Sequence, residues 1–250
     1  MSIADKVIQL KQDIDDAYQA GYDKGVGEGS GSGDSWYDTF WDAIQQNGDR
    51  RDYQCAFTNS TGWTDEIFKP KYKFINTTGN YGFSYMFQNH KGITKVTKDM
   101  FDIDSSIGYY AIYMFAGAYI NEVEYDLRKA SSVQRLFQNF KGESVTLYNW
   151  YGFFNYDNTF IGCSNLKHLW IEGTLNSPNV FNLASSPLDA ESIAHTISIL
   201  YDGATGRTIS FKQSAVDSAF ETAEGLADGS TSEEWLALVA TKPNWAISLA

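Results

Sequence analysis

The feature that constrains this chain most is the spacing of apolar residues in the stretch FIGCSNLKHLWIEG, residues 160–173. Phe160, Cys163, Leu166, Leu169 and Ile171 follow one another at gaps of three, three, three and two residues. Strand side chains alternate between two faces whereas turn positions do not, so the change from three to two predicts an irregular or 3₁₀-like turn that leads into a β-strand. Such a unit cannot bury its apolar face alone, which predicts that it stacks on similar units.

Three imperfect copies of this unit precede it. They begin at Phe87, Phe115 and Phe137, and the distances to the next anchor are 28, 22 and 23 residues. Leucine-rich repeats have a period of about 20–29 residues. The last two distances are nearly equal, whereas the unit at Phe87 is longer, holds an extra Met100-Phe101 and is expected to be irregular. A strand core should begin eight or nine residues after each anchor, with Val96, Val123, Tyr125, Val145, Leu147, Leu169 and Ile171 facing inward. The alternative is chance recurrence in a chain that is 16% aromatic.

Two helix-then-strand units follow in the C-terminal third. Asp189 is the predicted N-cap of the first helix, and a capping box at residues 231–234 opens the second. Alternating apolar residues predict strands at 209–211 and 247–249. These units are expected to add further parallel strands to the same stack.

The N-terminal region has a different pattern. Apolar residues stand four and three apart, as in the seam of a coiled coil, at Ile3, Val7, Leu10, Ile14 and Ala17. A glycine- and serine-rich stretch follows, which favours a tethered attachment helix; the alternative is an amphipathic helix packed on its own domain. The predicted divisions are an attachment helix at 1–24, a linker at 25–34, a capping helix and hairpin at 35–82, and the repeats at 83–250.

Composition excludes several classes of partner. The net charge of −12 disfavours nucleic acid and anionic membranes, which require a basic face. The longest apolar run, residues 109–120, is too short to cross a bilayer, and the N-terminus lacks the pattern of a secretory signal. The two cysteines stand in unrelated contexts, which argues against a disulfide scaffold or a cysteine zinc site.

Catalytic motifs are not apparent. The histidines, His90, His168 and His195, have no recognisable ligand spacing, and there is no nucleophile elbow or phosphate loop. The carboxylates of Asp99, Asp102 and Asp104 are close enough in sequence to bind a cation or act as a pair, but the stretch lacks the glycine and glutamate of an EF-hand, and a solvated acidic turn is favoured. The sequence therefore predicts a protein that is not an enzyme and holds no cofactor.

Two resemblances suggest a fold and a function. The stretch FIGCSNLKHLWIEG resembles leucine-rich repeats of the bacterial surface-antigen type. The layout of AYQAGYDKG, the glycine linker, WYDTFWDAIQQNGDR, the repeats and a terminal ALVATKPNWAISLA resembles tail and baseplate proteins of phages and prophages of anaerobic gut-type bacteria. The expected fold is α/β: an irregular leucine-rich-repeat solenoid with an N-terminal heptad helix on a Gly/Ser linker.

The resemblance implies a virion protein of the distal tail that binds a host-surface glycan or protein. It also implies contact with other tail or baseplate proteins and self-association through the N-terminal helix. The β-branched seam residues favour a dimer, and the resemblance favours a trimer. The alternatives are a purely structural tail part, a polysaccharide depolymerase, or a bacterial surface adhesin.

Strand alternation predicts where a ligand would bind. If the apolar residues face inward, the side chains between them form an exposed concave row. We expect this row to contain Glu122, Glu124, Asp126, Ser144, Thr146, Tyr148, His168, Trp170, Glu172, Thr208, Ser210 and Lys212. Trp170 is the main candidate because an exposed indole beside hydroxyls and acids can stack on a sugar; the alternative is that it packs over neighbouring units.

Overall fold

A computed structural model describes residues 53, 56–65, 74–75, 82–103, 108–151, 156, 158–176, 180–203, 205–220 and 232–250. The chain divides into two compact units, 1–48 and 49–250, and every described residue belongs to the second. The predicted attachment helix, linker and capping helix lie outside the described residues. The second unit is a mixed α/β structure with parallel sheets.

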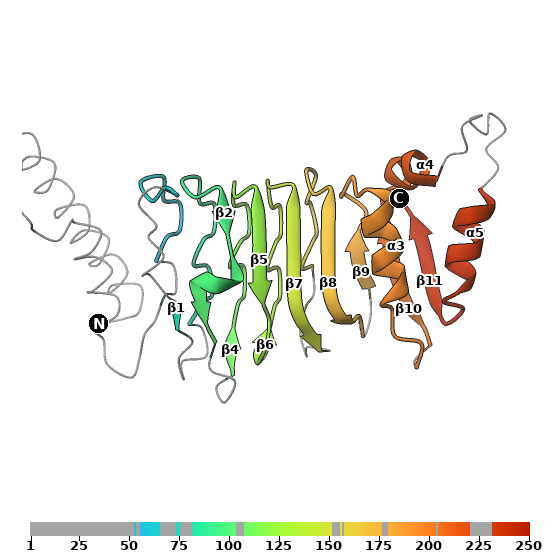
Figure 1. The fold of residues 1–250 in the computed structure, drawn as a ribbon, viewed down its shortest axis with the longest axis horizontal. Coiled ribbons are helices and arrows are strands. Elements are labelled where there is room, and N and C mark those ends of the chain that lie inside the picture. Colours follow the sequence, from blue (N-terminus) through green and yellow to red (C-terminus); the bar gives the residue numbers. More distant parts are fainter. Residues whose placement is uncertain are drawn as a thin grey trace, which may run out of the picture. The chain divides into compact units, whose positions relative to one another are not determined.

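The largest sheet has four parallel strands in the order of the chain (Figure 1). They are β2 (Lys95–Val96), β5 (Glu122–Asp126), β7 (Ser144–Tyr151) and β8 (His168–Thr174). Val96, Val123, Val145 and Leu169 are partners across the sheet, and all four are buried. The predicted strand starts and their inward faces are therefore confirmed.

The anchor phenylalanines form a continuous ladder in the turns before these strands. Neighbouring rings are nearly parallel, with centroids 5.2 to 5.7 Å apart along the series Phe57, Phe87, Phe115, Phe137 and Phe160. The turns are also joined through their backbones: the N–H of Phe115 donates to the carbonyl of Leu136, and that of Phe137 to Thr159, both at 2.9 Å. The four predicted anchors are thus confirmed as equivalent, and Phe57 adds one more.

Left-handed residues stand two positions before and two positions after the anchors Phe87, Phe115, Phe137 and Phe160, and two positions after Phe57. They are Asn59, Tyr85, Asn89, Tyr113, Gly117, Arg135, Asn139, Asn158 and Gly162. Glycine and asparagine adopt this conformation most readily, which explains their place after the anchor. Before the anchor, three of these residues are neither glycine nor asparagine, so the left-handed conformation costs more free energy there. Their side chains pack together: Tyr85 and Tyr113 stack at 5.2 Å, and the guanidinium of Arg135 lies over the Tyr113 ring.

Short strands form the second side of the stack. β1 (Phe74–Ile75) pairs in parallel with β3 (Phe101–Asp102), and β4 (Tyr109–Tyr110) with β6 (Ala130–Ser132). The 3₁₀ helix η1 (Lys98–Met100) lies between β2 and β3 along the chain. The unit at Phe87 was predicted to be irregular, and this inserted helix confirms the irregularity.

The predicted hairpin is wrong in the part that is described. The N–H groups of Tyr53 and Phe57 donate to the carbonyls of Gly82 and Met86, at 3.0 and 2.9 Å. This segment is therefore the first layer of the turn ladder, joined to the layer that follows it in the chain, and β1 pairs in parallel instead of forming an antiparallel hairpin arm.

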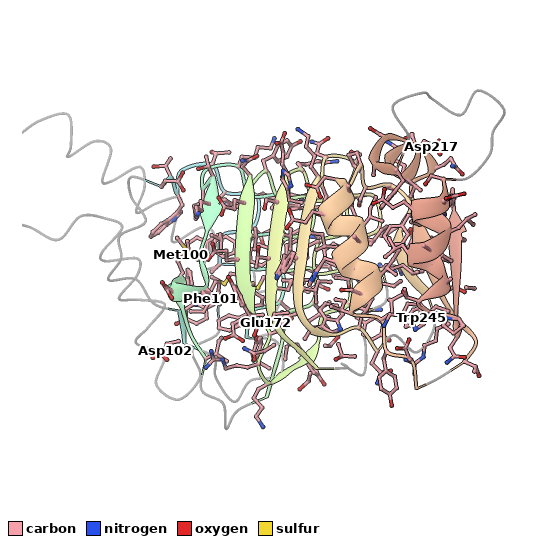
Figure 2. All side chains as sticks on the ribbon, turned by 45° about the vertical axis from the view of Figure 1, so that its right-hand side comes forward. Met100, Phe101, Asp102, Glu172, Asp217 and Trp245 are labelled. Atoms are coloured by element: carbon pink, nitrogen blue, oxygen red, sulfur yellow. The ribbon has the colours of Figure 1, made fainter. Side chains whose placement is uncertain are left out.

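The C-terminal strands form a separate parallel sheet. Its order is β11 (Trp245–Leu249), β10 (Arg207–Phe211), β9 (Val180–Leu183). The parallel direction was predicted correctly, but the expectation that β10 continues the row of β8 is wrong, because β9 and β11 are its partners. In Figure 2, Phe101 is labelled on the left of the row of described strands, Trp245 on the right, and Glu172 between them.

Three helices accompany this sheet: α3 (Ala190–Ser198), α4 (Gln213–Phe220) and α5 (Glu233–Ala240). Asp189 caps α3 as predicted, by accepting a hydrogen bond from the Ser192 N–H at 2.8 Å. The N-cap of α5 is Ser232, whose hydroxyl accepts from the Trp235 N–H at 3.1 Å; residue 231, the predicted start of the capping box, lies outside the described residues.

Candidate ligand-binding face

The four-stranded sheet brings half of the predicted exposed residues together in two rows. Lys95, Glu122, Ser144 and His168 are register partners in one row, and Glu124, Thr146 and Trp170 in the next. All of these side chains are half-buried or exposed. Adjacent strands lie about 4.8 Å apart, so the side chains of a row follow one another at that spacing.

One face of the Trp170 ring is covered by His195 from α3. The two rings are stacked, with centroids 3.5 Å apart and an angle of 6° between their planes. His195 Nε2–H donates to the carbonyl oxygen of Ile171 at 2.9 Å, and the N–H of Leu169 donates to Ser192 Oγ at 3.0 Å. Helix α3 therefore satisfies the free edge of β8 and holds the indole in a fixed orientation.

Thr146 on β7 is the register partner of Trp170, and Glu124 on β5 is the register partner of Thr146. Trp170 remains 43% exposed despite the histidine on one side. Thr146 is smaller than Glu124 and Trp170 on either side of it, and two strand spacings, or roughly 10 Å, separate those two positions. We call these three residues the strand-face notch. The set combines an aromatic ring, a hydroxyl and a carboxylate.

Ion pairs border the notch on the neighbouring row. Lys95 Nζ lies 2.8 Å from a carboxylate oxygen of Glu122, and His168 Nδ1 lies 2.5 Å from Asp189 Oδ2. Partial burial works against ionisation of Asp189, but hydrogen bonds from Ser192 and the nearby His168 outweigh it, so that its pKa lies below the ordinary value.

Two of the predicted row members have other roles. The Asp126 side chain is buried, and its carboxylate accepts hydrogen bonds from the backbone and guanidinium of Arg128 and from Asn149 Nδ2. Burial opposes its ionisation, but these hydrogen bonds outweigh burial and lower its pKa. Tyr148 is half-buried, and the ammonium of Lys98 lies 5.2 Å from the centre of its ring. Asp126 is therefore removed from the predicted ligand face.

The predicted residues of the C-terminal unit do not join this face. Ser210 Oγ lies 2.7 Å from Ser248 Oγ within the three-stranded sheet, and Lys212 follows β10 and accepts a backbone hydrogen bond from Val216 at the start of α4. Thr208 pairs with Val180 and Ala246. Glu172 is exposed on β8 (Figure 2), but it does not continue a row of the ligand-binding face because it has no register partner on β7.

His90 and Cys163 have structural roles. His90 is fully buried; its Nδ1 lies 3.3 Å from the Phe57 carbonyl, and its Nε2 accepts from the Ile93 N–H at 2.9 Å. Burial lowers the pKa of this histidine, which favours the neutral ring. The Cys163 thiol donates to the Phe137 carbonyl, and burial raises its pKa to about 12, so it is not a thiolate at neutral pH.

The predicted cation site is only partly described. Asp99 and Asp102 are both exposed, and Asp104 lies outside the described residues. Within the described ranges, no group of three or more histidine, cysteine or acidic side chains is arranged to hold a metal ion. The three-carboxylate site itself stays a prediction.

Sequence reasoning missed His195 as a member of the ligand-binding face. One signal was available, because Ser192 and His195 stand three apart and so share one side of the helix predicted after Asp189. What the sequence did not indicate is that this side lies along the edge of β8.

Among the described residues, no helix has both the length and the apolar character needed to span a membrane. Comparisons with family models, with curated proteins and with solved structures find no match to this chain.

Proposed function

We propose that this protein is a receptor-binding appendage of a phage tail or baseplate, and that its stacked layers are an irregular leucine-rich-repeat solenoid presenting the strand face to a host-surface glycan. The solenoid is supported by the phenylalanine ladder and by strands that keep one register over four layers. The tail assignment is supported by the resemblance of the chain's layout to tail and baseplate proteins. Its location would be the virion.

The strand-face notch is the observation that carries the binding proposal. An indole held by His195 offers its free face to the C–H groups of a sugar ring, and the Thr146 hydroxyl and Glu124 carboxylate can bond to sugar hydroxyls. Glycoside hydrolysis generally uses two carboxylates, and Glu122, which stands two residues from Glu124 on the same face of β5, forms an ion pair with Lys95 at 2.8 Å. We therefore favour binding over cleavage, with no cofactor; a structural tail part is the second candidate.

Replacing Trp170 and Tyr148 together by alanine tests the strand face. The wild type is first screened on an array of bacterial polysaccharides and host glycans, and the affinity for the strongest hit is then measured by calorimetry. The double variant should bind at least about tenfold more weakly, which corresponds to about 1.4 kcal/mol. Its free energy of unfolding should fall by no more than about 1–2 kcal/mol, because both side chains are partly exposed.

Tyr201→Ala is the matched control. Tyr201 is as exposed as Trp170, at 43%, but lies outside the four-stranded sheet, so its loss should leave the affinity unchanged. Unchanged affinity in the folded Trp170/Tyr148 variant would contradict binding at the strand face. A wild type that binds no glycan but assembles into tails would favour the structural candidate.

Self-association through the N-terminal seam is part of the same proposal. Leu10→Asp with Ile14→Asp would place charges in the predicted coiled-coil seam, which should convert a dimer or trimer into a monomer. Light scattering after gel filtration measures the mass, and circular dichroism should be retained for the repeats. A wild type that is already monomeric in isolation would contradict self-association.

A further inference from the structure

A second concave site lies on the turns, away from the strand-face notch. It is a pocket of about 430 Å³ spanning three consecutive layers of the phenylalanine ladder. We call it the amide pocket. It is lined by Gln88, Asn89, Tyr113, Ala116, Gly117, Tyr119, Gln138, Asn139 and Lys141. Its volume is within the usual range for ligand sites, about 300–1,000 Å³.

The pocket forms because the middle of the three layers carries alanine and glycine at the positions where the layers on either side carry glutamine and asparagine. The outer layers carry the same motif, FQNHKG at 87–92 and FQNFKG at 137–142, and the middle layer reads FAGAYI at 115–120. The three turns are in register, since the Asn89 N–H donates to the Ala116 carbonyl and the Gly117 N–H to the Gln138 carbonyl, at 2.9 and 2.8 Å. A glutamine–asparagine pair therefore stands in the layer on each side of Ala116 and Gly117, with about 10 Å between the two outer layers.

The two glutamines supply the amide groups that are available for a ligand, since within the described part of the chain the side chains of Gln88 and Gln138 make no hydrogen bond to another residue. The asparagines are packed instead: Asn89 Nδ2 donates to Asn59 Oδ1 at 3.1 Å, Asn89 Oδ1 lies against Gly117, and Asn139 Oδ1 lies against Gly162. A carboxamide offers both donors and an acceptor, which matches the hydroxyl groups of a sugar. Backbone hydrogen bonds between the turns position both pairs, so little conformational freedom of the main chain is lost on binding.

The two ends of the pocket are aromatic. Tyr113 is held between the Tyr85 ring, stacked at 5.2 Å, and the guanidinium of Arg135 at 5.3 Å, so its position is fixed. Tyr119 is 51% exposed, and the ammonium of Lys91 lies 4.9 Å from its ring centre. Tyr119 thus provides an exposed ring beside the amide groups.

The local charge of the pocket is opposite to that of the whole chain. The net charge is −12, yet the pocket lining contains Lys141 and no acidic side chain, and Lys91 stands beside Tyr119. No described carboxylate forms an ion pair with either lysine. A ligand with a negative group near Tyr119 would therefore find an available ammonium partner.

From these features we infer that the amide pocket binds a saccharide unit carrying a carboxylate, of the uronic-acid type. The glutamine amides bond to ring hydroxyls, Tyr119 contacts the C–H groups of the ring, and Lys141 pairs with the carboxylate. This site is separate from the strand-face notch. The inference of saccharide binding at the amide pocket depends neither on the proposal of a tail protein nor on ligand binding at Trp170.

The test uses the full chain with glucuronic acid and glucose as probes, since the two sugars differ at C6 by a carboxylate. Protein NMR with each sugar up to about 10 mM, ten times a Kd of about 1 mM, measures both affinities. The wild type should bind glucuronic acid at least about threefold more tightly than glucose, the size of one exposed charge pair. Equal affinities, or no shift with either sugar, would overturn the proposal.

Two variants test the position of the site. Ala116→Gln places in the middle layer the residue that both neighbouring layers carry, so it should fold but fill the pocket and weaken glucuronic acid binding at least about tenfold, or 1.4 kcal/mol. Lys141→Gln should remove the preference for glucuronic acid over glucose. Lys129→Gln, an exposed lysine outside the pocket, is its matched control and should keep the preference.

Gln138→Ala and Gln134→Ala form a second matched pair, because both glutamines belong to one turn and only Gln138 lines the pocket. Only the Gln138 variant should bind more weakly. Retained affinity in folded Ala116→Gln and Gln138→Ala variants would overturn the assignment, as would an equal loss in Gln134→Ala. Trp170→Ala should leave this affinity unchanged, so failure of the strand-face proposal and failure of this one give different results.

Discussion

Replacing Phe137 by alanine is expected to lower the free energy of unfolding by about 3–5 kcal/mol, the range for a large aromatic side chain removed from a packed core. Phe137 is fully buried between Phe115 and Phe160, whose ring centroids lie 5.2 and 5.4 Å away, and the edge of Phe140 contacts it at 5.3 Å. The change would leave a cavity in the middle of the ladder, where neighbouring layers cannot close it without losing their register. Urea unfolding followed by tryptophan fluorescence measures the effect.

Leu236→Ala provides the control for this experiment. Leu236 is 55% exposed on α5, so its truncation should change the free energy of unfolding by less than about 0.5 kcal/mol. A loss below about 1 kcal/mol for Phe137→Ala would contradict the ladder as the core of the repeats, since that is the cost of an ordinary substitution.

Gly142→Ala is expected to destabilise the protein by at least about 2 kcal/mol, as overpacking against a rigid neighbour does. A Cβ atom at this position would lie 1.9 Å from the carbonyl oxygen of Ile120 and 2.5 Å from the Phe140 ring. Because the oxygen belongs to the backbone of the adjacent layer, it cannot move without separating the two turns. Gly92, at the same position of the other FQNxKG motif, has the same relation to the carbonyl of Trp63, at 1.8 Å.

Gly62→Ala is the matched control, because a Cβ atom there would have no other atom within 4 Å. Thermal unfolding of both variants shows whether the loss of stability comes from the close approach of the layers at Gly142 or from the replacement of any glycine by alanine. Equal melting temperatures for the two variants would contradict the close packing of layers at Gly142.

The sequence predicted the repeated part of the fold because its signals are local. The change from three-residue to two-residue spacing gave the strand starts, and the four anchors proved to be stacked rings. Phe57 was not recognised as an anchor because 30 residues separate it from Phe87, outside the period of the other units. Asp189 was found as a helix cap for the same reason as the strands: the capping pattern involves only neighbouring residues.

The alternation of inward and outward side chains did not predict the exposed residues correctly where a strand ends or belongs to the other sheet. Asp126 follows the buried Tyr125 and is itself buried, because the strand ends there and Arg128 and Asn149 supply hydrogen bonds to its carboxylate. Ser210 and Lys212 have the spacing of row residues, but nothing in a local pattern tells which sheet a strand joins.

For the units that begin at Phe87, Phe115, Phe137 and Phe160, the sequence by itself determined which apolar residues face the core and in which layer each stands, because these follow from periodicity along the chain. Only the tertiary structure decided which exposed residues meet. It placed His195 on the indole of Trp170, set the small Thr146 between two larger neighbours, and aligned Ala116 and Gly117 between two glutamine–asparagine pairs. The physical reason is that such contacts depend on the docking of one layer or helix against another, and residues far apart in the sequence fix that docking together.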